Sequence, residues 1–350
     1  MCVDEADRRN PNGTLLAQRS FMKNSHPSHA KAINMLALAT IFWGLSFPVM
    51  KALGQLQHQL LPESSSWFGT AFVNTLRFGA ASVLMALFTV RSLKHMTRSE
   101  VWQGFGLGFF GGVGCIFQMD GLNYTSASTS AFLTQAYCIV LPVILAIRTR
   151  RWPPAKLIVA SLLVIIGITI LSDVSWGDFK LGRGETETLI GSMIFAGQIL
   201  WLERPAFRDN NVNHFSLVMF TTIAVIGGIF LLLTMGNLSE PLTMLRSGSV
   251  HLLVGQLVIF CTLIAYVMMN HWQPKISSTE AGLIYCVEPV FASLFALFLP
   301  AYYSGWFSVK YPNELVTQSL LWGGSLILAA NILLQFNFKK SKNSPTEPHT

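Results

Sequence analysis

The sequence predicts an all-α polytopic membrane protein with ten transmembrane helices, arranged as two inverted five-helix repeats. Three observations carry this prediction. Of the 350 residues, 51% are hydrophobic and only 12% are charged, against about 25% charged residues in soluble domains. Long apolar runs recur from Ile33 to Phe338, and Lys and Arg gather in alternate loops. Segments of the second half also repeat features of the first.

Ten apolar segments are long enough to cross a hydrocarbon layer of about 30 Å as helices. They cover residues 33–52, 70–90, 101–122, 128–147, 155–172, 187–204, 214–235, 251–271, 280–300 and 317–337. Continuous apolar runs favour helices over a barrel, whose strands would alternate. Residues 1–30 contain no apolar core of a secretory signal and are predicted to be a disordered tail. Met22 offers an alternative start, which would make residues 1–21 an upstream extension.

The distribution of Lys and Arg predicts the orientation of the chain, because these residues concentrate in cytoplasmic loops. If the N-terminus is cytoplasmic, eighteen of the 24 Lys and Arg residues lie in cytoplasmic segments and five lie outside. The remaining one, Arg77, lies within a span. Both termini are therefore predicted to be cytoplasmic, in the inner membrane of a bacterial cell.

An internal repeat relates the two halves. The spans at 128–147 and 280–300 contain "QAYCIVLPVILAI" and "LIYCVEPVFASLF", each with a Tyr-Cys pair before a proline. The last spans of the two halves also match, "ASLLVIIGITIL" with "GSLILAANILLQ". Five helices per repeat is an odd number, so the second copy is inverted in the membrane. The predicted organisation is a tail over 1–30, repeats over 31–172 and 187–338 joined by a linker over 173–186, and a cytoplasmic tail over 339–350.

Several classes of site find no support in the residues. The five cysteines form no CxxC pair and show no metal-ligand spacing, so neither a metal site nor another cofactor is predicted. The glycines of "GFGLGFFGGVG" have no preceding strand and no following Lys-Ser/Thr, which argues against a phosphate loop. Their four-residue spacing favours close helix packing instead. The basic residues follow the membrane topology, so no nucleic-acid partner is predicted.

Inverted repeats are typical of alternating-access transporters, whose site lies near the midplane between the halves. The expected partners are a small-molecule solute and the lipid bilayer, with protons as a candidate coupling ion and a homodimer left open. Two alternatives remain. An intramembrane enzyme would need a nucleophile and base, or metal ligands, on facing helices, and no such set is found. A receptor or scaffold would not need a duplicated design.

Four stretches in order resemble EamA-type members of the drug/metabolite transporter superfamily. They are "ATIFWGLSFPVMK" (Ala39–Lys51), "LRFGAASVLMAL" (Leu76–Leu87), "GLNYTSASTSAFL" (Gly121–Leu133) and "VEPVFASLFA" (Val287–Ala296). The resemblance covers about residues 31–338 and implies efflux of an amino acid or similar metabolite. Family members usually carry a Leu-Gly-Glu turn after helices 4 and 9, which this chain lacks, so the resemblance does not define the substrate.

Polar and aromatic residues within the spans are the candidates for the site. A charge in a membrane helix normally faces a partner, a cavity or the interface. Arg77 could bind substrate or bond to backbone carbonyls, and Glu288 could be structural, pair with Arg77, or couple transport to protons. Pro142 and Pro289 each remove a helical donor and are expected to break their helices. The resemblance places the candidate substrate-binding residues on cavity-lining helices: Trp43, Phe47, Arg77, Gln118, Tyr137, Gln198, Trp201, Tyr266 and Tyr285.

Overall fold

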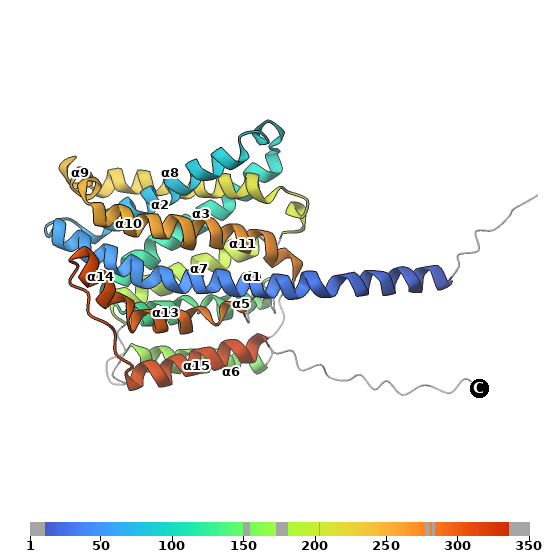
Figure 1. Cartoon of the computed structure of the whole chain (residues 1–350). Helices are drawn as coiled ribbons and strands as arrows, with labels where there is room; N and C mark the ends of the chain where they lie inside the picture. Colours follow the sequence, from blue (N-terminus) through green and yellow to red (C-terminus); the bar gives the residue numbers. More distant parts are fainter. Residues whose placement is uncertain are drawn as a thin grey trace, which may run out of the picture.

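The computed structural model describes residues 11–149, 155–172, 181–202, 204–276, 281 and 284–335. Most of these residues are helical, and no strand occurs among them. The all-α part of the prediction is therefore confirmed. The longer helices run roughly side by side, and the N-terminal part of α1 projects beyond the bundle at one end (Figure 1).

The α-helices, in chain order, are α1 Pro11–Leu60, α2 Ser66–Thr89, α3 Arg98–Tyr124, α4 Ala127–Thr134, α5 Tyr137–Thr149, α6 Ala155–Leu171, α7 Arg183–Leu202, α8 Val212–Thr234, α9 Ser239–Arg246, α10 Gly248–Gln256, α11 Ala265–Trp272, α13 Glu288–Ala296, α14 Leu299–Phe307 and α15 Gln318–Gln335. Between them lie the 3-10 turns η1 Leu93–His95, η2 Pro205–Phe207 and η4 Gln273–Lys275. The segment η3, Leu257–Ile264, is a π-helix that joins α10 directly to α11.

Polar residues at helix starts explain several boundaries. Ser65 accepts a hydrogen bond from the Trp67 amide before α2. At the start of α3, Thr97 and Glu100 form a capping box, in which each side chain accepts from the other residue's amide, at 3.2 and 2.7 Å. Such caps satisfy amides that have no partner within the helix. The helices thus begin where short polar residues precede the apolar runs.

Five helical stretches of the described chain are long and apolar enough to cross a membrane. They are His29–Leu60, Ser66–Thr89, Arg98–Tyr124, Val212–Thr234 and Gly248–Lys275. A sixth is possible if α13 and α14, which bend by 50°, form one span. Shorter apolar helices cover Ala127–Leu141, Ala155–Leu171 and Gln318–Leu333. Helix α7 is not among the helices apolar enough to cross a membrane, because its first turns contain the charged residues Arg183, Glu185 and Glu187.

Large apolar side chains cover the outer surface of the bundle. Leu87 and Phe88 of α2 are 67% and 77% exposed, and Leu232 and Leu233 of α8 are 68% and 75% exposed. A soluble protein rarely exposes such contiguous apolar surface. With the long apolar helices, this surface identifies an integral membrane protein.

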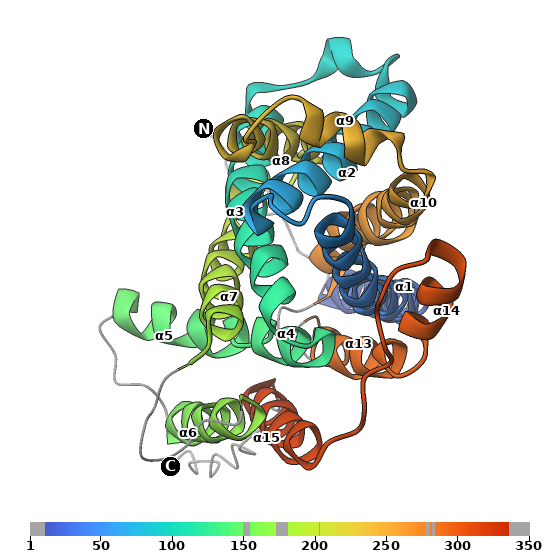
Figure 2. The same cartoon turned by 90° about the vertical axis from the view of Figure 1, so that its left-hand side faces the viewer.

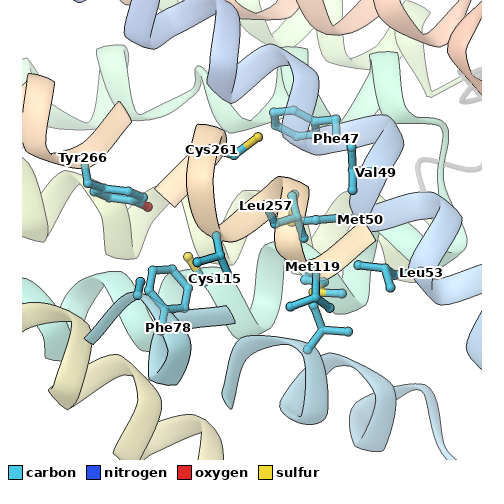
Figure 3. Packing of buried hydrophobic residues seen from close by; sticks show 14 of the residues in the cluster. Phe47, Val49, Met50, Leu53, Phe78, Cys115, Met119, Leu257, Cys261 and Tyr266 are labelled. Atoms are coloured by element: carbon cyan, nitrogen blue, oxygen red, sulfur yellow. The ribbon is translucent and has the colours of Figure 1, made fainter. Parts of the chain in front are cut away.

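Helix α3 lies against both α7 and α8, and α2 also packs on α8. Helix α1 contacts α13 and α11, while α6 and α15 pair with each other on one side of the bundle (Figure 2). Between α1, α2, α3 and the π-helix lies a buried apolar cluster that includes Phe47, Phe78, Cys115, Leu257 and Tyr266 (Figure 3). This cluster forms the wall on which the candidate site is built.

Some boundaries differ from the sequence predictions. Helix α1 begins at Pro11, within the predicted tail, whereas residues 1–10 and the predicted tail at 339–350 lie outside the described residues. Helix α7 begins at Arg183, within the predicted linker 173–186, of which residues 173–180 lie outside the described part. Hydropathy detects only the apolar runs, so these polar extensions of the helices could not be predicted from it.

Candidate functional site

A cavity of about 100 Å³ lies at the centre of the bundle. Its walls come from α1, α2, α3, α4, α5, α7, α11, η4 and the residues around the start of α13. Residues far apart in the sequence are therefore brought to one site.

Eight of the nine residues predicted to bind substrate line the cavity. These are Trp43, Phe47, Arg77, Gln118, Tyr137, Gln198, Tyr266 and Tyr285, and Glu288 lines it as well. The ninth, Trp201, lies elsewhere: it lines a separate groove near the end of α7, and its Nε1 donates to the Gln103 carbonyl at 3.2 Å. The indole packs over Gly106, where a Cβ atom would lie 2.1 Å from the ring. Because the Trp201 indole occupies this recess, it lies outside the cavity.

An aromatic group forms one wall of the cavity. The ring of Trp43 lies 5.5 Å from that of Tyr266 and 5.6 Å from that of Tyr285, between centroids. The Tyr285 hydroxyl donates to Gln273 Oε1 at 2.9 Å. The Trp43 Nε1 is buried and has no hydrogen-bond partner among the described residues. Since buried polar groups are nearly always hydrogen-bonded, this donor is a candidate contact for a bound solute.

Arg77 is buried and bonds only to neutral groups. Its Nε donates to Thr262 Oγ1 at 2.5 Å, and one terminal nitrogen donates to the Cys261 carbonyl at 3.2 Å. The other terminal nitrogen lies 3.5 Å from Met50 Sδ. Thr262 and Cys261 belong to the π-helix, whose wider turn alters the usual pairing of backbone groups. The predicted alternative of bonding to backbone carbonyls is thus realised in part, and Arg77 is also one of the residues that line the cavity.

Glu288 does not pair with Arg77. In the described part of the chain its Oε2 accepts a hydrogen bond from Gln135 Nε2 at 3.2 Å, and no cationic group lies within 4 Å of it. Gln135 and Glu288 both lie at breaks in their helices. Gln135 follows the last residue of α4, and Glu288 begins α13 after a turn at Cys286 and Val287.

The two prolines relate differently to these breaks. Pro289 lies in the first turn of α13, directly after the break, where a missing amide hydrogen costs nothing. Pro142 lies inside α5, and the first-half break precedes it, at Gln135 and Ala136. The expected break at Pro142 is therefore displaced upstream. A proline disfavours the turn before it because its ring crowds the carbonyl four residues earlier, which is that of Cys138.

Sequence reasoning missed several lining residues, among them Ser46, Thr134 and Gln273. Thr134 Oγ1 accepts from Gln118 Nε2 at 2.9 Å, and its carbonyl accepts from Ser192 Oγ at 2.8 Å. Gln135 was missed too, although an amide inside an apolar run is itself a signal of an internal polar contact. Gln273 carried no such signal because it lies at the end of its span.

One end of the bundle is closed by charged caps. Lys51 Nζ donates to the carbonyls of Leu122, Asn123 and Thr125 at 2.7, 3.0 and 2.8 Å, at the end of α3. Directly beyond, Glu314 accepts from the Ala127 amide at 2.6 Å and from the Ser128 hydroxyl at 2.6 Å, at the start of α4. Each charge complements the dipole of the helix end that it contacts.

Arg183 extends this closure. It bridges Asp120 at 2.6 Å and Glu187 at 2.7 Å, and its guanidinium lies 4.1 Å from the ring of Tyr124. The side chain of Asp120 is fully buried at this contact. On α7 and α11–η4, the cavity-lining residues lie toward the opposite end, where the N-terminal part of α1 projects (Figure 1).

Among the described residues, no group of three His, Cys, Asp or Glu side chains is placed to hold a metal ion. The four described cysteines are buried and unpaired with one another. The cavity therefore offers hydrogen bonds, aromatic faces and two ionisable groups, Arg77 and Glu288. These groups suit reversible binding of a small polar molecule.

Comparison with known proteins agrees with this architecture. Residues 30–173 match the EamA-like transporter family. An "uncharacterized transporter" of Archaeoglobus fulgidus is 27% identical over 299 residues, which cover 85% of this chain and 84% of the relative. A solved crystal structure superposes with a TM-score of 0.51 at 16% identity, over 84% of this chain and 95% of that chain, a likeness of fold alone. The family match over residues 30–173 and the transporter relative together support an EamA-type transporter of the drug/metabolite transporter superfamily.

Proposed function

We propose that this transporter exports a small zwitterionic metabolite, an amino acid or a close analogue, by alternating access. The observation that carries the proposal is the placement of Arg77 and Glu288 in one small cavity, each without an oppositely charged partner among the described residues. Burying an isolated charge is costly unless it is compensated. A solute with a carboxylate and an ammonium group would compensate both.

The remaining groups of the cavity support this class of solute. Arg77 has five N–H donors, and its three bonds leave two of them without a partner in the described chain. The free Nε1 of Trp43 adds a neutral donor, and the rings of Trp43, Tyr266 and Tyr285 favour a cationic or apolar group. The volume of about 100 Å³ favours a small molecule over an extended drug-like one.

The helix contacts support the arrangement of ten helices in two inverted repeats. If each helix of the first half corresponds to one of the second, then α2–α8 and α6–α15 are pairs of equivalent helices in contact. The aligned prolines make α5 the counterpart of α13, so the contacts of α1 with α11 and α13 correspond to those of α7 with α3 and α5. A twofold relation of this kind places the cavity between the halves, as alternating access requires.

Alternating access also needs one end closed while the other admits solute. The caps formed by Lys51, Glu314 and Arg183 supply the closed end, and the cavity lies toward the end from which α1 projects. The bias of Lys and Arg assigns that end to the cytoplasm of a bacterial cell. Export, rather than uptake, follows from the family resemblance. Glu288 is the candidate for proton coupling because it is the one carboxyl on the cavity wall.

Efflux from proteoliposomes tests the proposal. Vesicles loaded with a panel of radiolabelled zwitterionic, anionic and cationic solutes would be assayed with and without a pH gradient. Zwitterions are expected to leave faster than solutes of either single charge. Preference for a single-charge solute would overturn the zwitterion assignment, and no movement of any solute by correctly folded protein would overturn transport through this cavity.

A further inference from the structure

A second hollow lies on the outside of the bundle, between α3 and the last turns of α7. It has a volume of about 660 Å³ and is separate from the central cavity. The apolar part of the groove is lined by Phe110, Gly197 and Leu200. At the end of the groove where α7 ends lie Trp201 and Arg204. A groove with an apolar body and one cationic end fits an amphiphile with an anionic head.

Trp201 is held firmly in the wall of this groove. Its indole fills the recess at Gly106, donates to the Gln103 carbonyl, and lies 6.2 Å from the ring of Phe110. Gly197 opens the floor in the same way, since a Cβ there would lie 2.7 Å from the Phe110 ring. The groove is therefore shaped by two glycines and two fixed rings, which makes it a preformed site.

Arg204 supplies a positioned positive charge. Its guanidinium stacks 3.8 Å from the Trp201 ring and remains exposed. Within the described chain no carboxylate lies within 4 Å of it. Glu100, at the same end of α3, is committed to the Asn211 amide at 2.9 Å and to His214 Nδ1 at 2.9 Å. Among the described residues, no carboxylate neutralises the charge of Arg204.

The surface beside the groove is aromatic. On α3, Trp102, Phe105 and Phe109 are 55%, 45% and 48% exposed. Trp102 and Phe105 stack at 5.8 Å, and Trp102 also contacts Trp201 at 5.6 Å. In an integral membrane protein, rings at a helix end pack along lipid chains near the headgroups. The groove consequently opens onto lipid.

We propose that this groove is a binding site for an anionic phospholipid. The lipid phosphate accepts hydrogen bonds from Arg204, whose planar fork matches phosphate oxygens. One acyl chain lies along Phe110 and Leu200. A zwitterionic lipid brings its own ammonium group next to the phosphate, so the site prefers a lipid with net negative charge. Basic pockets at the ends of membrane helices bind anionic headgroups in this way.

Native mass spectrometry of the full-length protein, purified and supplied with phosphatidylglycerol or phosphatidylcholine, tests the site. Wild type is expected to retain phosphatidylglycerol preferentially, and Arg204→Gln to weaken its retention about tenfold, as loss of a charge-assisted hydrogen bond predicts. Arg208→Gln is the matched control, because Arg208 is also exposed and nearby but does not line the groove. Equal retention of the two lipids, or equal loss in both variants, would overturn the site in favour of diffuse surface charge.

A second measurement locates the acyl chain. Brominated phosphatidylglycerol quenches tryptophan fluorescence on contact, and the difference between wild type and Trp201→Phe isolates the signal of Trp201. That difference is expected to be larger with brominated phosphatidylglycerol than with brominated phosphatidylcholine. It should not change with added inorganic phosphate, which lacks the chain. Displacement by millimolar phosphate would instead identify a free-anion site and contradict the proposal.

Discussion

Gln135 donates a hydrogen bond to Glu288 at 3.2 Å, joining the broken helix of the first half to the broken helix of the second. The two residues lie 153 positions apart in the chain. Because both lie at helix breaks, this contact joins the two halves at the points where alternating access would require them to move. A change in the charge of Glu288 therefore acts directly on the contact between the halves.

Replacing Glu288 with Gln is expected to keep solute exchange at a higher half-saturating concentration, because the ammonium group of the solute loses its counter-charge, and to flatten the dependence of exchange on pH. The amide preserves the size of the side chain and a hydrogen bond to Gln135, but it cannot exchange a proton. Exchange in proteoliposomes between pH 5.5 and 8.5 measures the effect. Glu240→Gln, at a half-buried site on α9 away from the cavity, is the control. An unchanged pH profile in the Glu288 variant would exclude it as the proton site.

Trp43→Phe is expected to raise the half-saturating solute concentration by about three- to tenfold. The substitution keeps an aromatic ring against Tyr266 and Tyr285 but removes the free Nε1 donor, and a neutral hydrogen bond contributes about 0.5–1.5 kcal/mol. Concentration-dependent efflux measures it. Trp201→Phe serves as the matched control because that indole lies outside the cavity. If both variants shift equally, Trp43 does not contact the solute through its donor.

Thr262→Val is expected to lower the stability of the protein by about 1–3 kcal/mol, because the buried Arg77 Nε would lose its acceptor. Thermal unfolding in detergent measures the loss. The control is Thr243→Val on α9, whose exposed hydroxyl bonds only within its own helix, to the Ser239 carbonyl. Added substrate should still stabilise the Thr262 variant, since the unused Arg77 donors remain. Loss of that stabilisation would show that Thr262 itself is needed for binding.

Glu314→Gln is expected to loosen the closed end of the bundle. The carboxylate accepts three hydrogen bonds at the start of α4, and a neutral amide complements the helix dipole less well. Hydrogen exchange of the Ala127 and Ser128 amides should accelerate about tenfold, which corresponds to about 1.4 kcal/mol. Glu63→Gln, in the exposed loop between α1 and α2, should leave these amides unchanged. Equal acceleration in both would attribute the effect to general charge.

Much of the fold could be predicted because the membrane makes apolar length and loop charge decisive. Long runs gave the main helices, and eight of nine proposed contacts line one cavity because the residues fall on inward faces of helices. Trp201 could not be placed in this way. It lies near the end of α7, where the direction of a side chain depends on a recess in another helix, at Gly106.

Two features of the backbone could not be predicted from the sequence. The π-helix "LVIFCTLI" is uniformly apolar and contains no glycine or proline, so its wider turn depends on tertiary contacts such as that with Arg77. The break in the first half was expected at Pro142 but lies before it. A proline destabilises the part of the helix that precedes it, but the sequence alone does not show at which turn the helix breaks. The pairing of Gln135 with Glu288 depends on that choice.

The π-helix also determines how α11, the helix that follows it, is rotated about its own axis. Each residue of an α-helix turns the chain by about 100°, so a widened segment rotates α11 relative to α10. If Leu257–Ile264 kept its length but closed into ordinary α-helix, Tyr266 and Met269 would swing by about that angle, away from the cavity. One surplus residue in a featureless apolar run thus decides which face of α11 the solute meets.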